Sequence, residues 1–284
     1  MLPVTISMRD STESINSLKE MGVTEANLQL FPEDLSNIAI TINNIINIGF
    51  KIVSVHTPFN IGWKGYCFED WMNEPIIERS LYLVQELAIA LDIKELPTVI
   101  HCRLTPAELY KVKPILPRVR QVLESVPRVH LCLENVPGLN ENLPKRYSEL
   151  ITALPTVVKA LQKELPKVSM CFDVCHASIT CRMIEVLQGY GLHRNQPIPE
   201  LHDFLRMSDG TIALVHLANC RNLGDGEDHG TAFTDPKELD IILKILNRYC
   251  PQATVVLEVS ESDYAERPNV KATLKCYSEI NNNK

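Results

Sequence analysis

The sequence lacks the features that mark several large classes of protein. It has no C-x-x-C pair, since its closest cysteines are Cys171 and Cys175, so the spacing of a zinc ribbon or a thioredoxin-type redox site is missing. No apolar run approaches the roughly 18 residues of a membrane-spanning helix. The first residues lack the basic start and apolar stretch of a signal peptide. We therefore expect a cytoplasmic protein with no membrane partner.

Positive charge is also in short supply. The chain has 28 Lys and Arg against 35 Asp and Glu, for a net charge of -7. Proteins that bind nucleic acid usually carry an excess of Lys and Arg, so the composition gives no sign of such a surface, although a local basic patch is compatible with an acidic total. The nine cysteines are odd in number and lie mostly in apolar runs of a long chain. This pattern indicates reduced, buried thiols and not a disulfide scaffold.

What the sequence does contain is a regular alternation of short apolar runs and longer amphipathic segments. The runs are almost wholly apolar, as in parallel strands that are covered on both faces. The segments between them carry helix-capping signals, such as Ser11 and Asp235-Pro236, and residues 73–91 place apolar side chains at spacings of three and four. The eight strand candidates begin at Val4, Ala26, Lys51, Thr98, Val129, Val168, Thr211 and Ala253.

Eight alternating strands and helices with no linker between them predict an α/β fold. We expect one domain over residues 1–284, a single (β/α)8 TIM barrel with its active site at the C-terminal ends of the strands. A doubly wound open sheet is the alternative that shows the same alternation. The segment 179–208 interrupts the pattern as a polar excursion after the sixth strand, and it has no assigned role.

Side chains that bind metals gather where the predicted strands end. In a parallel barrel these ends meet at one rim. A lone buried histidine is usually a hydrogen-bonded core residue, but here six strand ends carry such side chains, and unpaired charges beside an apolar core are costly. A divalent transition metal removes that cost, because carboxylates and neutral imidazoles are its natural ligands. These residues are His56, His101, Glu134, Asp173 with His176, His216 and Glu258, and the loop after the seventh strand adds Glu227 and His229.

Other histidines and cysteines lie away from this rim. His130 begins a strand and should lie at the opposite end of the barrel, while His193 and His202 belong to the polar excursion. The cysteines beside His101 and Asp173 should point to the other face of their strands, because side chains alternate along a strand. We expect these thiols to pack against apolar neighbours and not to bind metal.

The residues at the rim and their order resemble the xylose isomerase-like TIM-barrel superfamily and, within it, the endonuclease IV group, also called AP endonuclease family 2. The resemblance runs from about Ala26 to Glu261. The matching segments, in chain order, are His56-Thr57-Pro58-Phe59, Leu133-Glu134-Asn135, Asp173-Val174-Cys175-His176 and His216-Leu217. An acid-x-His pair and a final Leu-Glu follow them.

The resemblance implies up to three bound metals, most simply Zn²⁺, with Mn²⁺ as the alternative. The implied ligands form three groups, and Glu134 belongs to the first two of them. In order, the groups are His56, His101 and Glu134; then Glu134, Asp173, His216 and Glu258; then His176, His229 and Glu227, where the family has Asp.

Such a cluster suits the hydrolysis of a phosphoester, because adjacent cations polarise the phosphoryl group, supply hydroxide and stabilise the leaving oxygen. Glu134 and Glu258 are the candidate catalytic residues, which would position the attacking hydroxide. The same superfamily supports a second interpretation, a sugar or sugar phosphate isomerase or epimerase. There one metal would be held by Glu134, Asp173, His216 and Glu258, and the two glutamates would move a proton. A third is a non-catalytic barrel, although every ligand position is retained.

The loops at the rim offer candidates for substrate binding. The segment after the third strand is rich in aromatic residues: Phe59 and Trp63 come first, and Tyr66, Phe68 and Trp71 follow. These rings could wedge into a duplex or cover a small ligand. The loop after the second strand carries Glu33 and Asp34, and these acids work against a DNA backbone. We expect the substrate to be a small phosphoester, a sugar or damaged DNA. The candidate substrate-binding residues are Phe59, Trp63, Arg103 and Arg221.

Overall fold

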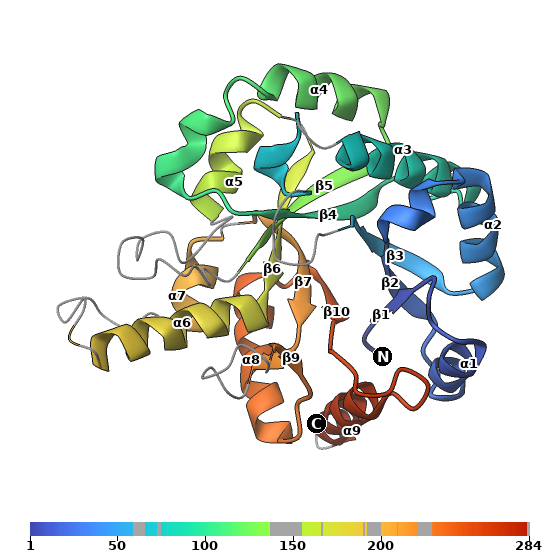
Figure 1. The fold of residues 1–284 in the computed structure, drawn as a ribbon. Helices are drawn as coiled ribbons and strands as arrows, with labels where there is room; N and C mark the ends of the chain where they lie inside the picture. The colour runs from blue at the N-terminus through green and yellow to red at the C-terminus, as the bar shows by residue number, and fades with distance from the viewer. Residues whose placement is uncertain are drawn as a thin grey trace.

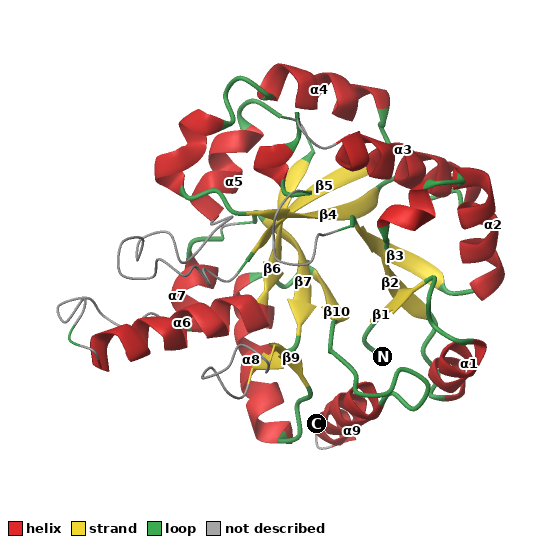
Figure 2. Ribbon diagram, viewed as in Figure 1, coloured by secondary structure: helices red, strands yellow, loops and turns green. Residues whose placement is uncertain are grey.

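The computed structural model describes residues 1–58, 66–72, 75–136, 155–165, 167–189, 191, 200–208, 210–220 and 229–282, with a few side chains excepted. Eight parallel strands close into a barrel in the order β1-β10-β7-β6-β5-β4-β3-β2 (Figure 1). Helices surround the strands, which lie in the centre of Figure 2. The predicted (β/α)8 TIM barrel is confirmed. The open sheet is wrong, because β1 pairs with both β2 and β10.

The strands of the barrel begin within two residues of their predicted starts. They are β1 (Val4–Ser7), β2 (Glu25–Gln29), β3 (Lys51–His56), β4 (Leu96–Cys102), β5 (Val129–Asn135), β6 (Val168–Asp173), β7 (Ile212–Leu217) and β10 (Thr254–Leu257). A short antiparallel hairpin of β8 (Asn219–Cys220) and β9 (His229–Thr231), which the sequence did not predict, follows β7.

The helices follow the strands in the expected alternation. The α-helices are α1 (Thr12–Glu20), α2 (Ile38–Ile48), α3 (Pro75–Ala90), α4 (Leu116–Ser125), α5 (Pro155–Gln162), α6 (Val174–Gly189), α7 (Leu201–Arg206), α8 (Pro236–Tyr249) and α9 (Pro268–Asn282). The described residues also form the 3-10 helices η1 (Pro32–Leu35), η2 (Phe68–Asp70) and η3 (Pro106–Lys111).

Two of the predicted helix starts have the expected caps. The Ser11 hydroxyl accepts a hydrogen bond from the Ser14 amide at 3.1 Å, and the Asp235 carboxylate accepts one from the Lys237 amide at 2.9 Å. These bonds satisfy amides that have no partner within the first helical turn. The capping signals therefore located α1 and α8 correctly.

Two layers make up most of the core that the structure describes. The larger lies between the strands and the surrounding helices, and it includes the buried face of α3. The smaller fills the inside of the barrel with Val99, Cys132, Cys171, Leu214 and Val256. All nine cysteines are free, eight of them buried, as the sequence predicted.

Two expectations about the connecting segments need correction. Residues 179–208 are not one polar excursion: α6 continues to Gly189, and α7 follows the undescribed residues 192–199. Phe68 and Trp71 are not surface wedges either, because both rings are buried and the Trp71 indole donates a hydrogen bond to Glu78 at 3.0 Å. In the part of the chain that the structure describes, no helix is long and apolar enough to cross a membrane.

A buried arginine holds the seam where the barrel closes. β1 and β10 share a single paired position, Val4 with Leu257. Beside this seam, the Arg267 guanidinium is buried, donates to the Ser14 hydroxyl at 2.9 Å and forms an ion pair with Asp10. The C-terminal segment is thus joined to the start of α1 by a charged contact.

Candidate metal centre

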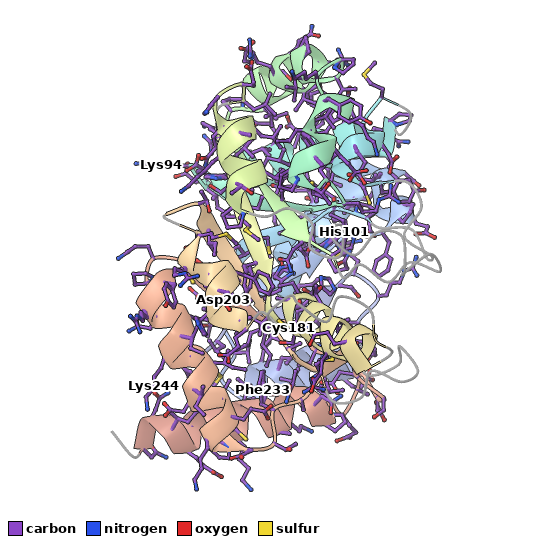
Figure 3. The ribbon with its side chains drawn as sticks, turned by 90° about the vertical axis from the view of Figure 1, so that its left-hand side faces the viewer. Lys94, His101, Cys181, Asp203, Phe233 and Lys244 are labelled. Atoms are coloured by element: carbon purple, nitrogen blue, oxygen red, sulfur yellow. The ribbon has the colours of Figure 1, made fainter. Side chains whose placement is uncertain are left out.

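The six predicted ligands at the strand ends lie together at one end of the barrel. Two pairs are direct neighbours across the sheet, His101 with Glu134 and Asp173 with His216. Figure 3 shows His101, near the end of β4, well apart from Lys94, which precedes the same strand. Five of the six side chains are buried, while Glu258, directly after β10, is 25% exposed. The convergence follows from parallel strands that end at a common rim.

Glu134 is at the centre of the cluster. Its Oε2 lies 3.0 Å from His56 Nε2 and 3.6 Å from His101 Nε2. Its Oε1 lies 3.3 Å from His216 Nδ1 and 3.6 Å from His176 Nδ1. One buried carboxylate therefore faces four imidazoles, two on each oxygen.

These contacts define two groups of candidate ligands that share Glu134. The ligand atoms within each group lie within 4.8 Å of one another, close enough for one cation. The first group is His56, His101 and Glu134, and the second is Glu134, Asp173, His216 and Glu258. Both agree with the groups that the sequence resemblance implies, and binding of metal by these residues stays a prediction.

The orientation of two histidines fits a cation. His56 Nδ1 donates to the Thr57 carbonyl at 2.6 Å, and His176 Nδ1 donates to the Asn135 carbonyl at 2.7 Å, because a carbonyl can only accept. In the neutral ring, each Nε2 then carries a lone pair. Metal-binding histidines are held in this way by backbone carbonyls. For His56, that lone pair faces a carboxylate oxygen, an arrangement that a cation between them would stabilise.

Asn135 supports the cluster from the end of β5. Its side-chain amide donates to the Asp173 carbonyl at 3.0 Å, and its Oδ1 accepts from the Asp173 amide at 2.8 Å. Asp173 Oδ1 in turn accepts from the His176 amide at 2.6 Å, at the start of α6. These bonds tie the ends of β5 and β6 and orient Asp173 and His176. The sequence motif contained Asn135, but its side-chain role was not recognised.

Charge in the cluster is balanced between the acids and His216. Burial opposes ionisation of Glu134, but the imidazoles of His216 and His101 hold its pKa well below the ordinary value. Burial likewise opposes a charge on His216, yet its acidic surroundings raise its pKa well above the ordinary value. Burial lowers the pKa of His101 to about 3. A bound cation would take over the role of the His216 proton, because imidazole binds metal in its neutral form.

Cys171 lies closer to the cluster than expected. It precedes Asp173 by two residues and so points into the barrel on the same face of β6. Its thiol forms a compact group with Glu134 and His216. Burial raises the pKa of the Cys171 thiol well above the ordinary value. A thiol in this state packs inside the barrel, whereas Cys102 lies in the outer core, as alternation predicts.

The third predicted ligand group is only partly described. His176 lies at the rim, with its ring centroid 6.3 Å from that of His101. Glu227 lies outside the described residues, as does the side chain of His229, whose backbone belongs to β9. This group stays a prediction.

The candidates for substrate binding differ in where they lie. Arg103 Nε and Nη2 each lie 2.5 Å from a carboxylate oxygen, of Glu69 and Asp70 respectively. Its guanidinium therefore joins the loop after β4 to η2. These two acids form a further compact group with Cys67, but Arg103 neutralises them. Phe59, Trp63 and Arg221 lie outside the described residues.

A cavity of about 510 Å³ opens beside Glu258 at the ends of β1, β2 and β10. Its walls include Ser7, Arg9, Gln29 and Phe31, none of which was predicted as a site residue. The available signal was the position of Gln29 at the end of the second strand, a polar residue after an apolar run. The cavity is in the size range of sites for small molecules.

The acidic side chains of the loop after β2 interact with neighbouring groups of the protein. Glu33 forms an ion pair with Arg9 at 2.7 Å. Asp34 Oδ2 accepts a hydrogen bond from the Phe31 amide at 2.7 Å and so closes the turn of η1. Both acids therefore have local partners, and the loop is a weaker argument against an anionic substrate.

Comparison with known proteins finds similarity in fold and not in sequence. No protein-family model matches the chain, and no curated protein matches it by sequence. A D-tagatose 3-epimerase-like protein is 16% identical over 99% of both chains, with a TM-score of 0.61. An AP endonuclease, family 2, from Brucella melitensis is 12% identical over 93% of this chain and 96% of its own, with a TM-score of 0.58.

A xylose isomerase domain protein from Planctomyces limnophilus is 9% identical over 99% of this chain and 96% of its own, with a TM-score of 0.61. The resemblance read from the motifs is thus confirmed for the fold: the chain has the fold of xylose isomerase-like TIM-barrel proteins. Proteins of both reaction classes considered from the sequence, epimerase-like and endonuclease, are among these similar structures.

Proposed function

We propose that this protein is a metal-dependent enzyme that hydrolyses a phosphoester. The observation that carries the proposal is the sharing of Glu134 between two compact groups of ligands. Two cations held so close together are typical of enzymes that displace a leaving group from phosphorus. When bound, such cations polarise the phosphoryl group, lower the pKa of water and stabilise the leaving oxygen. Zn²⁺ fits the mixture of imidazole and carboxylate ligands, and Mn²⁺ is the alternative.

The protein's own residues have distinct roles in this proposal. Glu134 joins the two groups and fixes their separation through its contacts with His56 and His216. Glu258 belongs to the second group and also lines the cavity, so one of its carboxylate oxygens can accept a hydrogen bond from the attacking water. Asn135 holds Asp173 through two hydrogen bonds. Orientation of this kind accounts for much of the rate gained in phosphoryl transfer.

The second candidate function is isomerisation or epimerisation of a sugar or sugar phosphate. It is favoured by the position of Glu134 and Glu258, whose oxygens lie 3.3 and 2.5 Å from the same atom, His216 Nδ1. Two acids on either side of a substrate carbon could exchange its proton. In this interpretation His56 and His101 would bind substrate. Both rings are buried and point at Glu134, and neither lines the cavity beside Glu258, which favours hydrolysis.

The number of metals distinguishes the two candidates. We expect purified protein, prepared without chelator, to contain two or three transition metals per chain. His101→Gln should remove one metal and abolish hydrolysis of bis(p-nitrophenyl) phosphate, because His101 belongs only to the first group. His202→Gln is the matched control, since the His202 side chain is 41% exposed, belongs to neither ligand group and pairs with Glu200. One metal per chain in the wild type, unchanged by His101→Gln, would favour the isomerase and refute our preference.

Two further measurements refine the proposal. Glu227→Ala should lower the metal content by one and leave the other ions in place, and unchanged content would refute the third ligand group. Cleavage of a duplex with an abasic site, strongly reduced by added salt, would identify damaged DNA as the substrate. Hydrolysis of small phosphoesters alone would identify a small-molecule enzyme.

A further inference from the structure

The cavity beside Glu258 has one cationic group in its wall. Among the described residues that line it, Arg9 is the only lysine or arginine, and Asp10 is already paired with Arg267. Glu258 connects the cavity to the candidate metal centre. A molecule in the cavity would therefore meet the metal centre at one end and Arg9 on another part of the wall.

Arg9 is held in place by two neighbours. Its Nη2 lies 2.7 Å from Glu33 Oε2, and its guanidinium carbon lies 4.0 Å from the centre of the Phe31 ring, which also lines the cavity. Within the described part of the chain, Nε and Nη1 of Arg9 have no hydrogen-bond partner. A guanidinium with free N–H groups suits the oxygens of a phosphate, which it can bind in pairs. The pair with Glu33 is exposed, so it competes weakly with such a ligand.

Gln29 provides a second, independent polar contact. The residue is buried, with 7% of its surface exposed, and it lines the same cavity. Its Nε2 donates to the Leu30 carbonyl at 2.8 Å and is 3.4 Å from the Thr57 carbonyl. Its Oε1 has no partner among the described residues. The two carbonyls fix the amide so that Oε1 is left to accept a hydrogen bond from a ligand hydroxyl.

We propose that the cavity binds a small hydroxylated phosphoester with a further phosphate group that Arg9 recognises. Gln29 Oε1 would accept a hydrogen bond from one hydroxyl, and the phosphoester that is hydrolysed would face Glu258. The proposal deepens the proposed function, because it takes the cavity as the substrate site of the same centre. The cavity of about 510 Å³ is large enough for a small phosphorylated sugar.

The test compares the binding of ribose 5-phosphate and of ribose to the metal-loaded protein by isothermal titration calorimetry at constant salt. The wild type should bind the phosphate at least ten times more tightly than ribose. Arg9→Gln should weaken binding of ribose 5-phosphate at least tenfold and change binding of ribose less than twofold. Arg120→Gln is the matched control, because Arg120 is an exposed arginine paired with Glu164 outside the cavity lining. Gln29→Met should weaken both ligands alike.

Several results would overturn the proposal. These are an equal loss for both ligands in Arg9→Gln, an unchanged affinity for the phosphate, or a wild type that does not prefer the phosphate. The binding assay needs no turnover, so its outcome is separate from that of the hydrolysis assay. Absence of hydrolysis with the expected binding pattern would refute only the proposed function. Hydrolysis without that pattern would refute only the role of Arg9.

Discussion

The contact between Arg267 and Asp10 makes a strong prediction about stability. Their side chains are 2% and 4% exposed. Arg267 also donates to the Ser14 hydroxyl at 2.9 Å and to the Thr5 carbonyl at 3.3 Å. Arg267→Met fills much of the same space but removes the charge, so that the Asp10 carboxylate stays buried without its cation. Breaking a buried ion pair in this way costs about 3–5 kcal/mol.

The expected effect can be stated as a melting temperature. With an unfolding entropy of about 2.1 cal/mol/K per residue, a chain of 284 residues has about 0.6 kcal/mol/K. Arg267→Met should therefore lower the Tm by about 5–8 °C in differential scanning calorimetry at pH 7. Arg120→Met, which removes an exposed ion pair with Glu164, should lower it by less than about 2 °C.

The dependence on pH provides a second test of the same contact. Burial raises the pKa of Asp10 above its ordinary value, although Arg267 acts to lower it. The folded state then holds this proton more tightly than the unfolded state, so lowering the pH through the raised pKa stabilises the fold. Removal of Arg267 should raise that pKa further. The loss in Arg267→Met should therefore shrink as the pH falls from 7 towards 4.

A double variant checks the cause of the loss. Asp10→Asn keeps an oxygen for the Ser7 amide, which donates to Asp10 at 3.1 Å, but it removes the charge. The variant with both Asp10→Asn and Arg267→Met should therefore be more stable than Arg267→Met alone. Our reasoning is refuted if Arg267→Met melts within 2 °C of the wild type, or if the double variant recovers nothing.

Three further predictions concern a helix cap, a tight backbone contact and the metals. Ser11→Ala removes the cap of α1 and should cost about 1 kcal/mol, a decrease of about 2 °C in Tm; Ser11→Asp should restore the loss. Gly230 and Gly210 both have φ of 78°. A Cβ added to Gly230 would lie 2.7 Å from the Ser260 hydroxyl oxygen, whereas a Cβ added to Gly210 would have none of the described atoms within 4 Å. Gly210→Ala should cost about 1–2 kcal/mol from backbone strain alone, and Gly230→Ala clearly more; equal losses by thermal unfolding would contradict the clash. Removal of the proposed metals by a chelator should lower the stability by about 4 kcal/mol for each metal, if the free metal was present at about a thousand times its Kd. A Tm unaffected by the chelator would contradict binding to the folded state.

The sequence by itself determined the barrel and the neighbourhood of its candidate ligands. Runs such as residues 212–217 are almost wholly apolar because parallel strands are covered on both faces, and such a pattern can be recognised within one short segment of sequence. Parallel strands end at a common rim. Because His56, Glu134 and His216 each lie at the end of a predicted strand, the sequence was sufficient to predict that they lie close together. The caps of α1 and α8 were equally legible, since each depends on residues within one helical turn.

Only the tertiary structure decided which charged groups are paired and where a ligand has room. Arg267 and Asp10 are 257 residues apart, and Arg9 meets Glu33 across the ends of two strands. The guanidinium of Arg103, a candidate for substrate binding, is held by Glu69 and Asp70. Such partners depend on the paths of the loops that follow the strands. The periodic pattern of apolar residues in the sequence does not predict these paths. The cavity beside Glu258 arises in the same way, from side chains of three strand ends whose spacing is set by closure of the barrel.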